Sequence, residues 1–180
     1  MKRRYVLLVA AVAAAILLLA VTPLGARQSG TFKADLIGYE EVPAVSTAAT
    51  GEFRAKLGAG PVIDYTLTYS DIHNAFAAHI HFGQKSVNGG VSAFLCGGGD
   101  KPPCPPTGGT VSGTIDAADV TGPTSQGIAP GEIQELIDAM RAGVTYANVH
   151  TSDGDTTPNE GPGDFPGGEI RGQIGRGGND

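Results

Sequence analysis

Apolar and polar residues alternate along most of the chain beyond residue 30, which is the pattern of β-strands with one face toward a core. The clearest example runs from 62 to 69, where every second residue is Ile63, Tyr65, Leu67 or Tyr69. The same criterion predicts eight strands, at 32–36, 51–57, 62–69, 76–82, 91–95, 110–115, 144–149 and 169–174.

One segment departs from this period of two. Ile133, Leu136, Ile137 and Met140 have the spacing of an amphipathic helix, and Gly143 follows as a helix-ending residue. We expect this single short helix to cover an open end or edge of the β-core. The fold class is therefore all-β: an antiparallel Greek-key sandwich or flattened barrel with one covering helix.

The N-terminus has the pattern of an export signal. Three basic residues, Lys2, Arg3 and Arg4, precede an apolar run from 5 to 21, and small residues precede Arg27. We predict a signal peptide at 1–26 and a single β-domain at 27–180. The alternative is an uncleaved membrane anchor, for which the apolar run is near the lower length limit.

Export would change the charge of the protein. Loss of residues 1–26 leaves 9 basic against 18 acidic residues, a net charge of −9 instead of −6. So acidic a domain does not favour binding to nucleic acid or to anionic membranes. We expect a secreted, periplasmic or cell-surface protein that meets the membrane only through an uncleaved N-terminus and binds an envelope or extracellular partner.

The two cysteines, Cys96 and Cys104, flank a short loop rich in glycine and proline. In an exported chain an even cysteine count favours a disulfide between them. The alternative is a pair of thiolates that bind a metal, which requires a reducing compartment or further ligands.

Histidines supply the candidate chemistry. His79 and His81 are two residues apart in a predicted strand, so their rings share one face, and His150 lies in a later strand. Converging neutral imidazoles are typical ligands of copper or zinc. We therefore consider a metal site of His79, His81 and His150, with Glu169 as a further ligand.

The competing interpretation gives the same residues a structural role, in which each histidine ring forms a hydrogen bond with a backbone carbonyl group or a carboxylate. Glu169 and Arg171 are also two residues apart, and a His–Glu–Arg hydrogen-bond network would hold the last strand to the core without a metal. The fourth histidine, His73, lies in a turn-like stretch, and we expect it to be exposed and outside the site.

Several sequence blocks resemble the CHRD domain family, named from repeats in chordin. The resemblance covers about 31–175 and is carried by FKADLIGYEEVP at 32–43, AHIHFG at 78–83, YANVHT at 146–151 and GGEIRGQI at 167–174. It implies an immunoglobulin-like β-barrel in an exported protein. The function of this family is poorly defined, so the resemblance implies a fold and a location rather than a reaction.

The order of the histidines is also similar to that of copper-zinc superoxide dismutase. This weaker resemblance implies that His79, His81 and His150 are copper ligands and that Arg171 faces an anionic substrate. The pattern is incomplete, because the only other histidine, His73, precedes the pair and no bridging histidine exists.

No recognised catalytic motif supports an enzyme: the chain has no G-x-S-x-G, no HExxH and no phosphate-binding glycine loop. We therefore favour a non-enzymatic binding module of undefined ligand. The alternative is a copper- or zinc-binding, dismutase-like protein.

Overall fold

A computed structural model of the chain describes residues 30–155 and 161–177. All eight predicted strands are present, and a two-residue ninth strand follows them. Their bounds are β1 (Thr31–Ile37), β2 (Thr50–Leu57), β3 (Ile63–Ser70), β4 (Ala75–Phe82), β5 (Gly90–Cys96), β6 (Gly109–Ile115), β7 (Thr145–Thr151), β8 (Ile170–Gln173) and β9 (Gly175–Arg176). The predicted signal segment lies outside the described residues.

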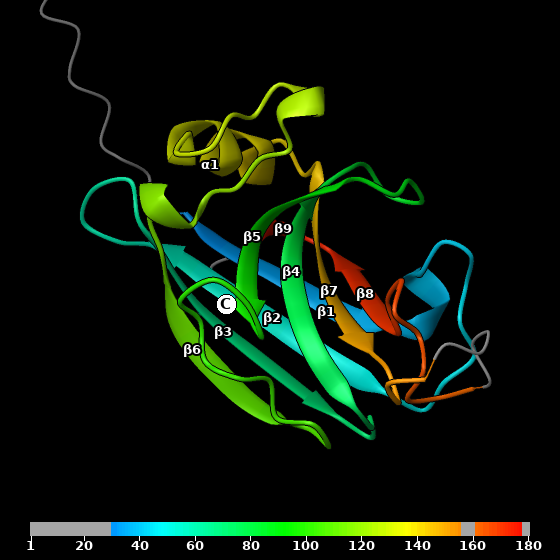
Figure 1. Ribbon diagram of the computed structural model, residues 1–180. Coiled ribbons are helices and arrows are strands. Elements are labelled where there is room, and N and C mark those ends of the chain that lie inside the picture. Colours follow the sequence, from blue (N-terminus) through cyan, green and yellow to red (C-terminus); the bar gives the residue numbers. More distant parts are fainter. Residues whose placement is uncertain (1–29, 156–160, 178–180) are drawn as a thin grey trace, which may run out of the picture.

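The strands form one antiparallel sheet that curls into a nearly closed barrel (Figure 1). Their order is β5-β4-β7-β8-β1-β2-β3-β6, and β9 pairs with β1. The two edge strands, β5 and β6, therefore come together where the barrel is not closed by a ladder. The predicted disulfide between Cys96 and Cys104 is confirmed, and it ties the end of β5 to the segment leading into β6. The metal-thiolate alternative is thereby wrong.

The alternation of apolar and polar residues along the strands determines which side chains form the core. The inward-facing residues of every long strand are apolar and nearly inaccessible to water, among them Leu36, Phe53, Leu67, Ile80 and Ile115. Burial of such side chains stabilises the barrel by about 1.5–3 kcal/mol each.

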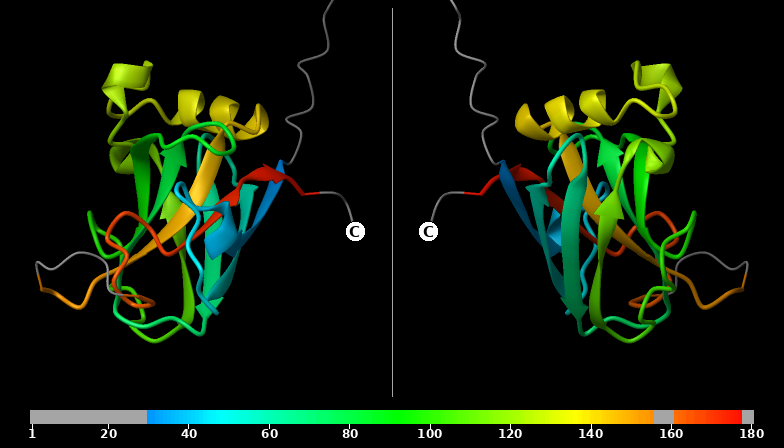
Figure 2. Two further views of the ribbon diagram at one scale, coloured as in Figure 1. Left: turned by 90° about the vertical axis from the view of Figure 1, so that its right-hand side faces the viewer. Right: turned by 90° about the vertical axis from the view of Figure 1, so that its left-hand side faces the viewer.

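The predicted helix is α1 (Ile133–Arg141), and it is the one α-helix among the described residues. Its residues Ile133, Leu136, Ile137 and Met140 are buried. The two side views in Figure 2 show that the helix lies over one end of the barrel. The remaining helical turns are short 3₁₀ segments in the connections: η1 (Gly38–Glu40), η2 (Ala117–Asp119) and η3 (Thr124–Gln126). Within the described part of the chain, no helix is long and apolar enough to cross a membrane.

Strands β4 and β7 differ from ordinary half-exposed strands, because both of their faces are largely buried. All seven residues of β7 are inaccessible, including the polar Asn148 and His150. Their inner faces belong to the core, whereas their outer faces lie beneath loops that include Gly89 and Pro166. This covered outer face carries the candidate site.

Candidate metal centre

The register of β4 against β7 brings the three predicted histidines together. Ala77 pairs with His150, His79 with Asn148 and His81 with Tyr146, so all six side chains lie on one face. The small side chain of Ala77 leaves room for His150 to reach His79 diagonally. One ring nitrogen from each of the three histidines lies within 4.8 Å of the others.

Backbone carbonyl groups determine which nitrogens carry protons. His150 Nδ1 lies 2.9 Å from the Pro166 carbonyl oxygen, and His81 Nδ1 lies 3.0 Å from that of Gly89. Because a carbonyl oxygen only accepts, each of these Nδ1 atoms donates. In its neutral form, each ring then has an unprotonated Nε2 with a free lone pair.

His79 completes this chain of hydrogen bonds. Its Nδ1 lies 3.0 Å from His150 Nε2, which accepts, so His79 Nδ1 is the donor. A neutral His79 consequently has a bare Nε2 as well. The Nε2 atoms of His79 and His81 are buried without a hydrogen-bond partner among the described residues. The cluster thus presents electron pairs and no proton to satisfy them, which is the donor set of a metal-binding site.

Burial keeps the cluster neutral. Desolvation, together with the neighbouring histidines, lowers the pKa of His79 from 6.5 to about 3. Desolvation likewise lowers the pKa of His81 to about 4, with His150 and Arg171 acting in the same direction and the Gly89 hydrogen bond opposing them. The pKa of His150 is also lowered, mainly by burial. Neutral imidazoles bind metal ions without first losing a proton.

Aromatic rings form the walls of the cluster. The ring of Phe94 meets His79 edge-on at 4.5 Å between centroids, and Tyr146 stacks on His81 at 4.8 Å. Phe94 belongs to β5, whose register against β4 shifts twice, once just before His79 and once just after Ile80. Such bulges re-aim side chains and are frequent beside functional sites.

Glu169 lies apart from the three clustered histidine nitrogens. Its carboxylate accepts hydrogen bonds from the Thr47 and Thr151 hydroxyls at 2.6 and 2.7 Å and from the Gly163 amide at 2.9 Å. It directly precedes the first residue of β8, so the two-residue rule that placed it beside Arg171 does not hold there. Its carboxylate instead binds the covering loops.

Arg171 is also hydrogen-bonded to a covering loop through its guanidinium group. Only 1% exposed, it donates to the carbonyl oxygens of Gln84 and Val87 at 3.0 and 2.9 Å and to Asn88 Oδ1 at 3.4 Å. Its guanidinium carbon lies 3.4 Å from the centre of the Tyr146 ring. Among the hydrogen bonds of the described residues, none joins Glu169 or Arg171 to a histidine. The alternative of a His–Glu–Arg network is therefore wrong in its partners, whereas the backbone carbonyl bonds expected in a structural role are present at His81 and His150.

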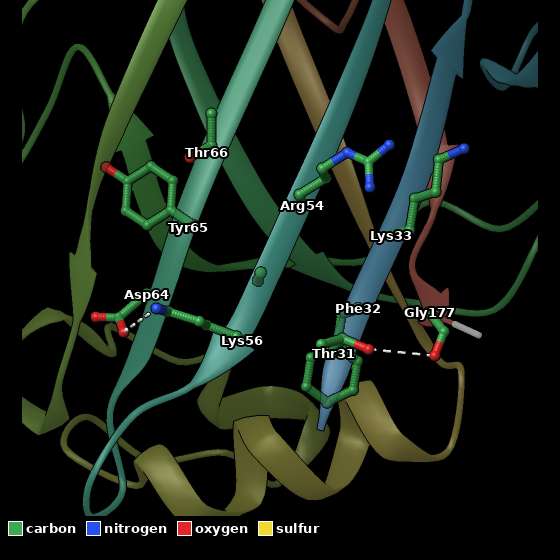
Figure 3. A pocket seen from close by; sticks show the side chains of 10 residues that line it. Thr31, Phe32, Lys33, Arg54, Lys56, Asp64, Tyr65, Thr66 and Gly177 are labelled. Atoms are coloured by element: carbon green, nitrogen blue, oxygen red, sulfur yellow. Dashed lines mark hydrogen bonds and ion pairs between the residues drawn. The ribbon is translucent and has the colours of Figure 1, made fainter. Parts of the chain in front are cut away.

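Two further surface features lie outside the cluster. His73 is exposed, as predicted. An open groove of about 510 Å³ lies over the outer face of β1, β2 and β3 (Figure 3). Two of its cations have acidic partners, since Lys56 lies 3.9 Å from Asp64 and Lys33 lies 3.1 Å from Asp35. The groove therefore offers no concentrated charge for a ligand.

Fold and site together define a class: an antiparallel β-barrel domain with three convergent, buried histidines on a covered outer face. Within that class the chain belongs to the CHRD domain family, whose model matches residues 32–174. Domains of this family are extracellular, with which the disulfide is consistent, and their function is undefined. No curated protein and no solved structure matches the chain. The likeness to copper-zinc superoxide dismutase therefore rests on the residues alone.

Proposed function

We propose that this protein is an exported, non-enzymatic module that binds one copper or zinc ion through His79, His81 and His150. The observation that carries the proposal is the pair of buried, unpartnered Nε2 atoms on His79 and His81. Leaving a buried polar atom unsatisfied costs about 1–3 kcal/mol. A bound metal ion would accept both electron pairs and offset that cost.

The spacing of the cluster suits such an ion. Two nitrogens bound to one tetrahedral zinc or copper ion at about 2.0–2.1 Å are about 3.3 Å apart. One ring nitrogen from each of the three histidines lies within 4.8 Å of the others, so small side-chain movements would bring the three to this separation. His81 and His150 each hold a backbone carbonyl with their second nitrogen, as metal-bound histidines usually do. Three nitrogen ligands would leave a further position for water or another ligand.

Export is supported by the basic and apolar N-terminal pattern, by the disulfide and by the family. Binding without turnover is supported by the surroundings of Arg171. A guanidinium that steers anions has to face solvent, whereas this one is enclosed by loop carbonyl groups and Tyr146. We therefore assign Arg171 the role of fastening the covering loop.

Metal content tests this function. We expect about one equivalent of copper or zinc per chain, by elemental mass spectrometry after export to a bacterial periplasm and purification without a tag. His81→Ala should abolish this content, because it removes one ligand. His73→Ala is the matched control and should retain it, since His73 is exposed and outside the cluster.

The absence of bound metal would contradict the proposal. If the protein retains no stoichiometric metal after incubation with Cu(II) or Zn(II) and desalting, the metal-binding function is wrong. The histidines would then serve to hold the loops through Gly89 and Pro166. Equal metal content in the two variants would exclude His81 as a ligand.

A further inference from the structure

A second buried group lies beside the histidines, and no sequence motif indicates it. Glu41 follows η1, and its carboxyl group is buried against Asn148. Asn148 pairs with His79 across β4 and β7 and with Arg171 across β7 and β8. Asn148 Nδ2 lies 3.5 Å from Glu41 Oε2, so the amide faces the carboxyl group.

Beside this contact, two acceptor oxygen atoms lie close to Gly168. Within the described part of the chain, Glu41 Oε1 and Asn148 Oδ1 are both buried without a hydrogen-bond partner. Both border Gly168, where a Cβ atom would lie 2.5 Å from Asn148 Oδ1 and 2.7 Å from Glu41 Oε1. Two oxygens that only accept cannot satisfy each other, but one proton on the carboxyl group would let it donate to the amide oxygen.

The burial of Glu41 supports that protonation. Burial raises the pKa of Glu41 from 4.5 to about 7, although Arg171, Asn148 and Val42 act to lower it. The charged and titratable groups that face it are Arg171 from β8 and Tyr146 from β7. The adjacent Glu40 is paired at 2.9 Å with Lys85 on the more exposed rim.

We infer that Glu41 is held as a neutral carboxylic acid by its burial against Asn148, and that it releases its proton to solvent when a divalent metal ion binds to the three histidines. The inference rests on the proposed metal-binding function. A divalent ion adds two positive charges to a buried neutral cluster near the Arg171 cation. Ionisation of Glu41 supplies one negative charge beside them.

The proton balance is simple. The O–H bond of Glu41 breaks, its electron pair stays on the carboxylate, and the proton passes to buffer. The histidines release none, since each already presents an unprotonated nitrogen. Glu169 is less suited to this role, because three donors already bind its carboxylate.

Calorimetry of zinc binding tests the inference with a redox-inert probe. Titrations of the whole protein at mildly acidic pH, in buffers of different ionisation enthalpy, give the number of protons released. We expect about one proton per zinc in the wild type and an affinity that rises up to about tenfold per pH unit below neutrality. Glu41→Gln should release none and lose this pH dependence, whereas Glu40→Gln is the control and should behave as wild type.

Infrared spectroscopy gives a readout that needs no variant. The carbonyl band of a protonated carboxylic acid should be present in the metal-free protein at mildly acidic pH and should disappear when zinc binds. Absence of zinc binding by the wild type would contradict the metal-binding function itself. Zinc binding without proton release, or a carboxylic acid band that persists in the zinc complex, would overturn the role of Glu41 alone.

Discussion

Acidification of the metal-free protein should expose the energetic cost of the histidine cluster. His79 and His81 have a lowered pKa, so their stability contribution is complete above about pH 6.5 and is lost as the pH falls. A histidine with a pKa of 6.5 in the unfolded chain and about 3 or 4 in the folded protein lowers the free energy of unfolding by about 2 kcal/mol at about pH 5, relative to neutral pH. His79 and His81 together therefore lower it by about 4 kcal/mol. His150 acts in the same direction.

Titration of Glu41 changes the stability with pH in the opposite direction. Its pKa is raised to about 7, so its contribution is complete below about pH 4.5 and is lost as the pH rises through 7. Acidification from about pH 7.5 to about pH 5 therefore restores about 2 kcal/mol through this group. The wild type should consequently lose about 2 kcal/mol from these three groups, whereas Glu41→Gln, which cannot titrate, should lose about 4 kcal/mol.

Urea unfolding with a chelator present measures this difference. The chain has 5 tyrosines and no tryptophan, so tyrosine fluorescence and far-ultraviolet circular dichroism are suitable probes. Other carboxyl groups titrate alike in both proteins and cancel in the comparison. Equal acid losses in the two proteins would refute the neutral Glu41. An acid loss below about 1 kcal/mol in Glu41→Gln would refute the neutral histidine cluster.

Two further predictions concern the parts that hold the site in place. Arg171→Met should lower the free energy of unfolding by about 2–4 kcal/mol, because it removes the guanidinium donor of the Val87 carbonyl group and one of the two donors of the Gln84 carbonyl group. A loss below about 0.5 kcal/mol in urea unfolding would contradict the role of Arg171 in fastening the covering loop. Replacing both Cys96 and Cys104 by serine should cost about 2–3 kcal/mol through loop entropy and leave metal content unchanged. Unaltered thermal stability of that double variant would show that the bridge does not stabilise the fold.

The sequence predicts the strands well because alternation is a local property that burial enforces. It also places His79 and His81 on one face without any knowledge of the partner strand. The approach of His150 to His79 depends on the register of the two strands, and the pairing of Ala77 with His150 joins residues that are 73 positions apart in the sequence. That register is a tertiary property, so the sequence supports convergence only as a hypothesis.

The limits of the sequence are clearest at the two glutamates. Alternation assigns Glu169 to the face of Arg171, but alternation applies only within the ladder, and Glu169 precedes it. Glu41 has no local signal, since its significance arises from Asn148, which is 107 residues away. Long-range contacts of single polar residues leave no periodic trace for a sequence pattern to detect.

The covered outer face of β4 and β7 argues for a ligand on energetic grounds. An antiparallel sheet with one face on a core can leave its other face in water at no cost. Here loops bury that face although it carries His79, His81 and Asn148, and the segment after η1 adds the buried Glu41. A buried atom without a partner among the described residues costs about 1–3 kcal/mol. Apolar residues at the same positions would pack against the loops without this free-energy cost. A bound cation would satisfy the two histidines, and without the cation a proton on Glu41 would let the carboxyl group donate to the Asn148 amide oxygen. The proposed exchange of this proton for the cation is why we connect the two groups in one site.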